Sequence, residues 1–98
     1  MLVLNVTFKC APGKREELRD LIRIEGIDTT SRNEEGNFNY SFYLSTEDPD
    51  DLFLVEFWKD VDAWQAHRTL PHYARLDELK KGRVIGAEIR KYFTDEEA

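Results

Sequence analysis

One carboxylate is unusual among the residues that could do chemistry. Glu56 lies in the run LFLVEFW, where strand alternation places it on the same face as Leu54 and Trp58. A carboxylate on an apolar face has to be paired or hydrogen-bonded. The nearest partner in type is His67, because a carboxylate beside an imidazole orients the ring and favours its charged form. The pair is either a general base with its orienting group or a structural pair in the core, and the residues leave both open.

Several other residues could line a site around this pair. Trp58 could be core or an aromatic platform for a ligand. Asn5 interrupts an apolar strand, so its amide is expected either at an edge or in a pocket as a donor. The remaining polar and aromatic candidates are Asn37, Tyr40, His72 and Tyr73.

Other kinds of site lack their patterns in this sequence. There is no glycine-rich nucleotide motif, no G-x-S-x-G elbow and no Cys/His cluster with zinc spacing. His67 and His72 are five residues apart with Pro71 between them, so they do not form an i, i+4 ligand pair. The acidic turn 47–51 lacks the central glycine of a calcium loop. We therefore expect neither a metal site nor a bound cofactor.

Composition narrows the range of partners. Fourteen Lys and Arg stand against twenty Asp and Glu, a net charge of −6, so neither nucleic acid nor an anionic membrane surface is an expected partner. The first residues, MLVL, lack the basic start and long apolar stretch of a signal peptide. The single cysteine, Cys10, cannot make an internal disulfide. These features predict a protein of the reducing cytoplasm.

The elements that must position these residues alternate between strand and helix patterns. Strands are predicted at 2–9, 38–46, 52–59 and 84–93, with Phe38, Tyr40, Phe42 and Leu44 on one face of the second. Helices are predicted from Pro12 to Gly26, and from Asp60 or Asp62 to Gly82 with a restart at Pro71. Residues 27–37 are polar and could hold a short second helix. The order β-α-β-β-α-β predicts one α+β domain over 1–98, a ferredoxin-like antiparallel sheet with helices on one face and a frayed acidic tail from about 94.

The third predicted strand is apolar on both faces. Helices on one side of the sheet would leave Phe53, Val55 and Phe57 on the open side, a patch that soluble monomers seldom expose. A homodimer formed sheet to sheet is therefore expected.

Short patterns over residues 36–73 resemble a known family. They are Gly36-Asn37-x-x-Tyr40, Asp48-Pro49, Phe53-Leu54-Val55-Glu56-x-Trp58, Ala63-x-x-x-His67 and Thr69-x-Pro71-His72-Tyr73. In this order and spacing they resemble the antibiotic biosynthesis monooxygenase (ABM) domain. The resemblance implies a dimeric α+β barrel. Members include cofactor-independent quinol or phenol monooxygenases, haem-degrading enzymes and an isomerase-like enzyme for a phosphorylated quorum-sensing sugar. The run Glu34-Glu35-Gly36-Asn37 is most similar to the quinol and isomerase branches.

The resemblance also implies roles for the candidate residues. A small electron-rich phenol would bind between sheet and helices against Phe42, Leu54 and Trp58, and would react with O₂ without a cofactor. His67 would act as base with Glu56 as its orienting group, while Asn37, Tyr40 or Asn5 would donate hydrogen bonds to the oxyanion. His72 and Tyr73 would lie at the rim. Two alternatives remain: a proton-transfer enzyme such as an isomerase, which needs no oxygen, and a ligand-binding module without catalysis.

Overall fold

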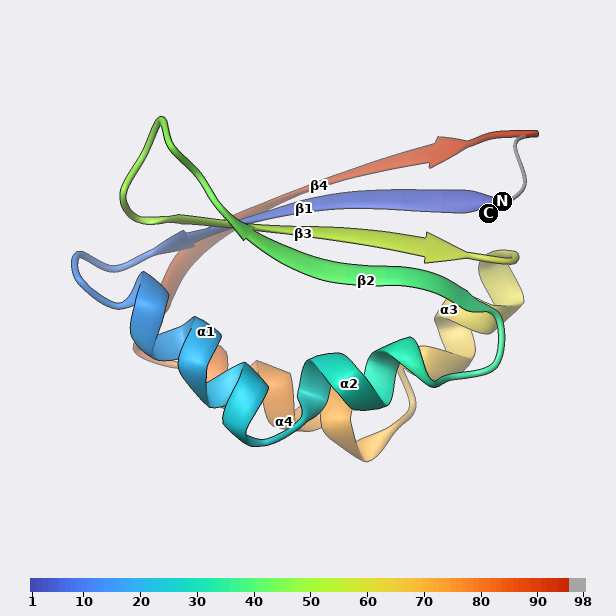
Figure 1. Cartoon of the computed structure of the whole chain (residues 1–98), viewed down its shortest axis with the longest axis horizontal. Helices are drawn as coiled ribbons and strands as arrows, with labels where there is room; N and C mark the ends of the chain where they lie inside the picture. Colours follow the sequence, from blue (N-terminus) through green and yellow to red (C-terminus); the bar gives the residue numbers. More distant parts are fainter. Residues whose placement is uncertain (96–98) are drawn as a thin grey trace.

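A four-stranded antiparallel sheet carries four helices on one of its faces (Figure 1). The computed structural model describes residues 1–95. The elements, in chain order, are β1 (Leu2–Cys10), α1 (Arg15–Ile24), α2 (Ile27–Arg32), β2 (Asn37–Leu44), β3 (Asp51–Trp58), α3 (Val61–His67), α4 (Pro71–Lys80) and β4 (Val84–Phe93).

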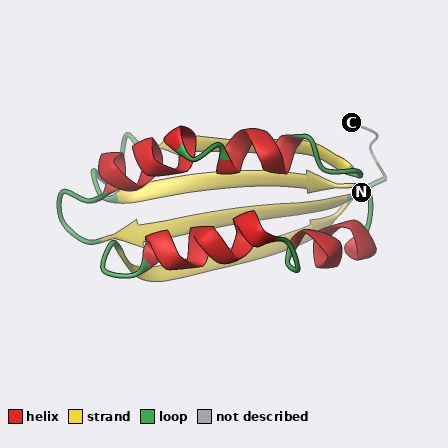
Figure 2. Ribbon diagram, turned by 90° about the horizontal axis from the view of Figure 1, so that it is seen from below, coloured by secondary structure: helices red, strands yellow, loops and turns green. Residues whose placement is uncertain are grey.

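The strand order is β2-β3-β1-β4, with every neighbouring pair antiparallel. The predicted ferredoxin-like α+β fold is therefore confirmed. The predicted end of the first helix at Gly26 and the predicted restart at Pro71 are confirmed, and the short helix considered within 27–37 is α2. Gly26, in a left-handed conformation, separates α1 from α2, and Pro71 begins α4 after a short turn. The helices lie in two rows along the strands (Figure 2).

The core lies between the sheet and the helices. Alternate residues of β1 and β3 point into it, and Glu56 is among them. The helices contribute Leu18, Ile22, Ile27, Leu76 and Leu79. Phe53, Val55 and Phe57 lie on the opposite, helix-free face of the sheet and are half-buried, as the alternation of β3 predicts.

Strand β2 departs from its predicted alternation. The register shifts between Asn37 and Asn39, so Phe38 lies in a bulge and is 51% exposed. Tyr40 and Phe42 keep the predicted orientation, opposite Glu56 and Leu54 respectively. The expectation of one shared face from Phe38 onward is therefore wrong at its first residue, because β2 is an edge strand and edges accommodate bulges.

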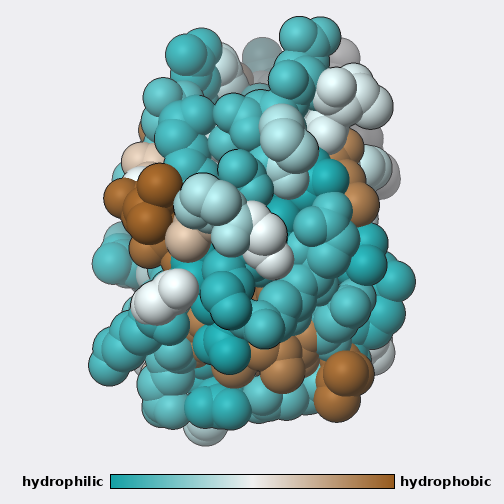
Figure 3. All heavy atoms as spheres, turned by 90° about the vertical axis from the view of Figure 1, so that its left-hand side faces the viewer, coloured by the Kyte–Doolittle hydropathy of each residue, from teal (hydrophilic) through white to brown (hydrophobic). Residues whose placement is uncertain are grey.

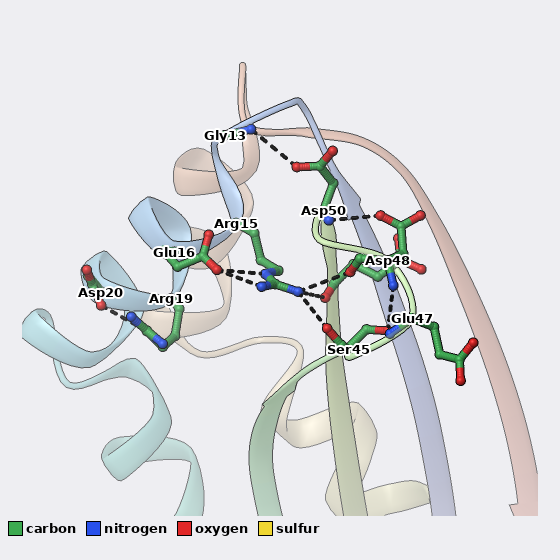
Figure 4. A network of polar contacts seen from close by, with 10 residues as sticks. Gly13, Arg15, Glu16, Arg19, Asp20, Ser45, Glu47, Asp48 and Asp50 are labelled. Atoms are coloured by element: carbon green, nitrogen blue, oxygen red, sulfur yellow. Dashed lines mark hydrogen bonds and ion pairs between the residues drawn. The ribbon is translucent and has the colours of Figure 1, made fainter.

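The acidic turn between β2 and β3 is held from the neighbouring helix. Arg15, at the start of α1, donates from Nη1 to the backbone oxygens of Ser45 and Asp48 at 3.0 and 3.1 Å (Figure 4). Its other nitrogens bind Glu16. The same end of the molecule is mostly hydrophilic, with separate hydrophobic patches (Figure 3). The turn is thus a solvated loop anchored by Arg15, and Lys9 adds an ion pair of 3.4 Å to Asp51.

The two ends of the described chain meet. The backbones of Met1 and Thr94 exchange two hydrogen bonds of 2.8 and 3.0 Å. Residues 96–98 of the predicted frayed tail lie outside the described residues. Among residues 1–95, no helix has the length and apolar character that crossing a bilayer requires.

Gly36 is required where the chain turns into β2. Its φ is +82°, and an added Cβ would lie 2.8 Å from the Cβ of Ala63. We expect Gly36→Ala to lower the free energy of unfolding by roughly 2 kcal/mol or more, since the left-handed conformation alone costs an alanine about 1–2 kcal/mol. Urea denaturation measures this change.

Gly82 provides the matched control. Its φ is +77°, but no atom lies within 4 Å of an added Cβ. Gly82→Ala should therefore show the backbone penalty alone. Equal losses in the two variants would show that the contact with Ala63 does not constrain this turn.

Candidate active site

A cavity of about 70 Å³ lies between the sheet and helices α3 and α4. Its walls are largely apolar, with Leu4 and Leu54 from the sheet and Leu76 from α4. Four of the predicted site residues that can hydrogen-bond also line it: Tyr40, Glu56, His67 and Tyr73. An apolar cavity with a few converging polar groups is the usual form of a small-molecule site.

His67 is the last residue of α3 and is only 2% exposed. Its Nδ1 lies 2.5 Å from Oε2 of Glu34, and its Nε2 lies 4.0 Å from Oε1 of Glu56. We assign the Nδ1–H donor to the neutral ring because Glu34 accepts there. Nε2 then retains its lone pair and can accept a proton.

The hydrogen-bond partner of His67 is therefore Glu34, and the expected direct hydrogen bond to Glu56 is not formed. Glu34 lies in the segment between α2 and β2, and its side chain is 10% exposed. The same Oε2 lies 2.7 Å from Nε2 of His72 in α4. One carboxylate oxygen thus joins two imidazoles from two different helices.

Glu56 is satisfied by a different neighbour. The indole nitrogen of Trp58, two residues along β3, donates to its Oε1 at 3.1 Å. The partner that Glu56 is predicted to need on this apolar face is therefore a residue of its own strand. Burial raises the pKa of Glu56 to about 7, and the nearby charge of Glu34 adds to that rise. Burial thus destabilises a second negative charge beside His67.

Burial also sets the protonation of the other groups. It lowers the pKa of His67, although Glu34 opposes that shift. The neutral imidazole that a base requires is therefore favoured at neutral pH. Burial raises the pKa of Tyr40, so its hydroxyl stays protonated and can donate a hydrogen bond.

Aromatic rings pack around His67. The ring of Trp58 lies 4.8 Å from it between centroids, and the ring of Tyr73 meets it edge-on at 5.2 Å. Trp58 is fully buried and does not line the cavity. It therefore packs against the His67 ring without forming part of the cavity wall. Phe42 and Tyr40 form a T-shaped pair with ring centroids 5.5 Å apart, and Phe42 does not line the cavity, contrary to the expectation that it forms a wall.

Two of the expected hydrogen-bond donors, Asn37 and Asn5, do not line the cavity. Asn37 donates its side-chain amide to the backbone oxygens of Asn39 and Phe57, which stabilises the bulge in β2. Asn5 lies on the helix-free face of the sheet, in a shallow hollow beside Phe53 and Arg90. The expectation that either amide reaches a substrate in this cavity is not supported, because the register of β1 and β2 turns both away.

Three of the lining residues that carry polar groups, Trp64, Asp77 and Lys80, are not among the residues predicted for the site. Trp64 of α3 borders the cavity, with Arg68 and Lys91 over its ring at 5.1 and 4.3 Å. Lys80 and Asp77 of α4 also line it and form an ion pair of 2.8 Å. For Glu34 the only available signal was its place beside Gly36-Asn37 in the family pattern.

Comparison with known proteins agrees with this architecture. The sequence model of the family "Antibiotic biosynthesis monooxygenase" matches residues 1–78. "Putative monooxygenase YcnE" of Bacillus subtilis is 33% identical over 73 residues, covering 74% of this chain and 75% of the relative. "Probable quinol monooxygenase YgiN" of Escherichia coli K12 is 26% identical, covering 92% and 94%. The crystal structure of PA3566 from Pseudomonas aeruginosa superimposes with a TM-score of 0.85 at 25% identity, covering 95% and 92%.

Proposed function

Because this chain belongs to the antibiotic biosynthesis monooxygenase family, we propose that it oxygenates a small phenol or quinol with O₂. The observation that carries the proposal is the buried imidazole of His67, whose Nε2 is free to accept a proton beside an apolar cavity. The substrate supplies the electrons, so the reaction requires no electron-carrying cofactor.

The reaction begins with proton transfer. His67 takes the phenolic proton on Nε2, and Glu34 stabilises the imidazolium through Nδ1–H. The phenolate gives one electron to O₂, and the aryloxyl radical and superoxide combine at a ring carbon. The O–O bond of this peroxide then breaks as the ring carbon that carries it loses its proton. One oxygen atom remains in the quinone, and the other leaves as water with the proton returned by His67.

Two tyrosines are placed to stabilise the oxyanion. Tyr40 and Tyr73 both line the cavity with His67. A well-aimed donor to a developing oxyanion contributes roughly 3 kcal/mol to the transition state. Of the three oxyanion donors that the resemblance implies, Asn37, Tyr40 and Asn5, Tyr40 is the one that lines the cavity.

The cavity is small even for a single aromatic ring, which disfavours larger substrates. Its volume of about 70 Å³ is below the roughly 150 Å³ of an apolar cavity that binds benzene. Substrate entry therefore requires a bordering side chain to move, and half-buried Trp64 borders the cavity. We expect hydroquinone-sized substrates to react faster than fused two-ring quinols, as parallel assays of the two would measure.

Oxygen uptake distinguishes this function from its alternatives. We expect the protein to consume O₂ when hydroquinone is added, with loss of turnover under argon. Turnover of an added metabolite that continues without O₂ would instead indicate a proton-transfer enzyme. Binding of aromatic ligands with no turnover would indicate a ligand-binding module.

Glu34 is proposed as the positioning residue for His67. Glu34→Gln should lower kcat by roughly 10²-fold or more, because the amide can hold the wrong tautomer of the imidazole. Without the carboxylate the pKa of His67 falls, so the acidic limb of the kcat/KM profile should move to lower pH. The other titratable groups facing this ring are Glu56, His72, Tyr40 and Tyr73. Glu35→Gln is the control because Glu35 is exposed; equal activities in both variants would contradict the assignment.

A sheet-to-sheet homodimer completes the proposal. Helices cover only one face of the sheet, and the other carries Phe53, Val55 and Phe57 with Tyr43 and Tyr92 beside them (Figure 1). Tyr43 and Tyr92 are 53% and 47% exposed in the single chain. A second copy of the same face would remove this apolar surface from water.

A further inference from the structure

Three side chains with metal-binding atoms converge beside the cavity. Glu34 comes from the α2–β2 segment, His67 from the end of α3 and His72 from the start of α4. One ligand atom of each lies within 4.8 Å of the other two. The side chains are 10%, 2% and 14% exposed respectively, so this is a largely buried cluster in which His67 is the most buried member, and not a solvated acidic surface.

The break between the two helices creates the cluster. On one continuous helix, a spacing of five residues would turn His67 and His72 apart. The turn after His67 and the new helix at Pro71 instead place the two rings 5.6 Å apart between centroids. The two histidines can therefore bind one ion from two helices, although their spacing does not allow it on a single helix.

The charge around the cluster favours a cation. Two buried carboxylates, Glu34 and Glu56, approach the same imidazole from opposite nitrogens. Within residues 1–95, the ion pairs of these carboxylates involve histidines only, with no lysine or arginine. The two carboxylates therefore have no lysine or arginine counter-ion among these residues. A divalent cation would supply one.

The second carboxylate also fits a metal site. If Nδ1 of His67 binds a metal, its ring proton moves to Nε2, which faces Glu56 at 4.0 Å. Histidines that bind metals usually give their other N–H to a carboxylate in this way. Glu56 would then accept from both His67 and Trp58.

We propose that Glu34, His67 and His72 form a binding site for zinc. Two nitrogens and one carboxylate oxygen are a ligand set that zinc accepts, at about 2.0–2.2 Å, with a fourth position for water or another small ligand. Tetrahedral coordination at those distances places ligand atoms about 3.3 Å apart. The two contacts to Glu34, now 2.5 and 2.7 Å, would lengthen by less than about 1 Å.

Zinc binding by the full chain tests the site directly. After chelator treatment and dialysis, titration calorimetry with Zn²⁺ should show one ion per chain for the wild type. Glu34→Gln and His72→Gln should each weaken binding by at least about 100-fold, and Glu56→Gln by about 10–100-fold. Glu35→Gln, an exposed neighbour, should bind as the wild type does. Circular dichroism checks that each variant is folded.

Two outcomes would overturn the site. The first is a wild-type protein that takes up no zinc, which would leave the cluster as a hydrogen-bonded group only. The second is zinc binding that Glu34→Gln and His72→Gln leave unchanged, which would place the ion elsewhere. A rise in melting temperature on adding zinc, present in the wild type and absent in Glu34→Gln, is a second measurement in its support.

A consequence for catalysis rests on the proposed function. Zinc on Nδ1 leaves a proton on Nε2, so His67 could no longer act as base at the cavity. Zinc should then inhibit oxygenation, and EDTA should restore it. Zinc that binds without inhibiting would contradict His67 as the base and leave the metal site intact. Oxygenation by a chain that binds no zinc would contradict only the metal site.

Discussion

Replacing His67 with glutamine is expected to lower kcat for hydroquinone oxygenation by about 10²–10⁴-fold, the usual contribution of a positioned general base. The imidazole is the one group lining the cavity that combines a free lone pair with a carboxylate stabilising its charged form. Glutamine keeps a polar side chain of similar length but cannot take the phenolic proton. Steady-state oxygen uptake at saturating hydroquinone measures the loss.

A control in the same helix separates catalysis from folding. Gln65 is exposed on α3 two residues earlier, so Gln65→Ala should retain wild-type activity. Thermal melts of both variants show whether the buried substitution leaves the protein folded. A folded His67→Gln variant with near wild-type kcat would remove His67 from the mechanism.

Introducing a charge on the helix-free face is expected to convert a dimer into a monomer. Val55 lies in the middle of β3, paired with Asn5 on one side and Ser41 on the other. In a face-to-face dimer, Val55→Asp would bury an unpaired carboxylate, which is strongly unfavourable. Sedimentation should give about twice the 11.6 kDa chain mass for the wild type and a single chain mass for the variant.

Ile24→Asp is the matched control for this experiment. Ile24 is 79% exposed at the end of α1, on the helix side of the molecule. Its substitution should leave the dimer intact. A wild-type protein that sediments as a monomer at the concentrations used for activity would contradict the dimer, whatever the variants do.

The sequence predicts the structure best where one hydrophobic periodicity extends over a whole helix or strand. Alternation in β3 placed Leu54, Glu56 and Trp58 on the core face and the two phenylalanines on the other. The glycine before β2 and the proline that begins α4 marked real boundaries. These features depend on neighbours close in sequence, which periodicity and turn chemistry describe directly.

Contacts between distant segments could not be predicted in the same way. The bond from Glu34 to His67 spans 33 residues, and it forms because the α2–β2 segment passes beside α3. Glu56 is the partner that the sequence suggests instead, because β3 directly precedes α3. The bulge at Phe38 and the orientation of Asn5 depend on strand register, which one sequence leaves undetermined.

The tautomer of His67 tests the central claim most directly. Long-range ¹H–¹⁵N NMR of the uniformly labelled, chelator-treated protein reports which ring nitrogen carries the proton. We predict a protonated Nδ1 and an unprotonated Nε2 at neutral pH, with Nε2 responding to an added phenol and with Nδ1 losing its proton in the presence of zinc. A proton on Nε2 in the metal-free protein would contradict the account, because His67 would then have no lone pair to offer a substrate.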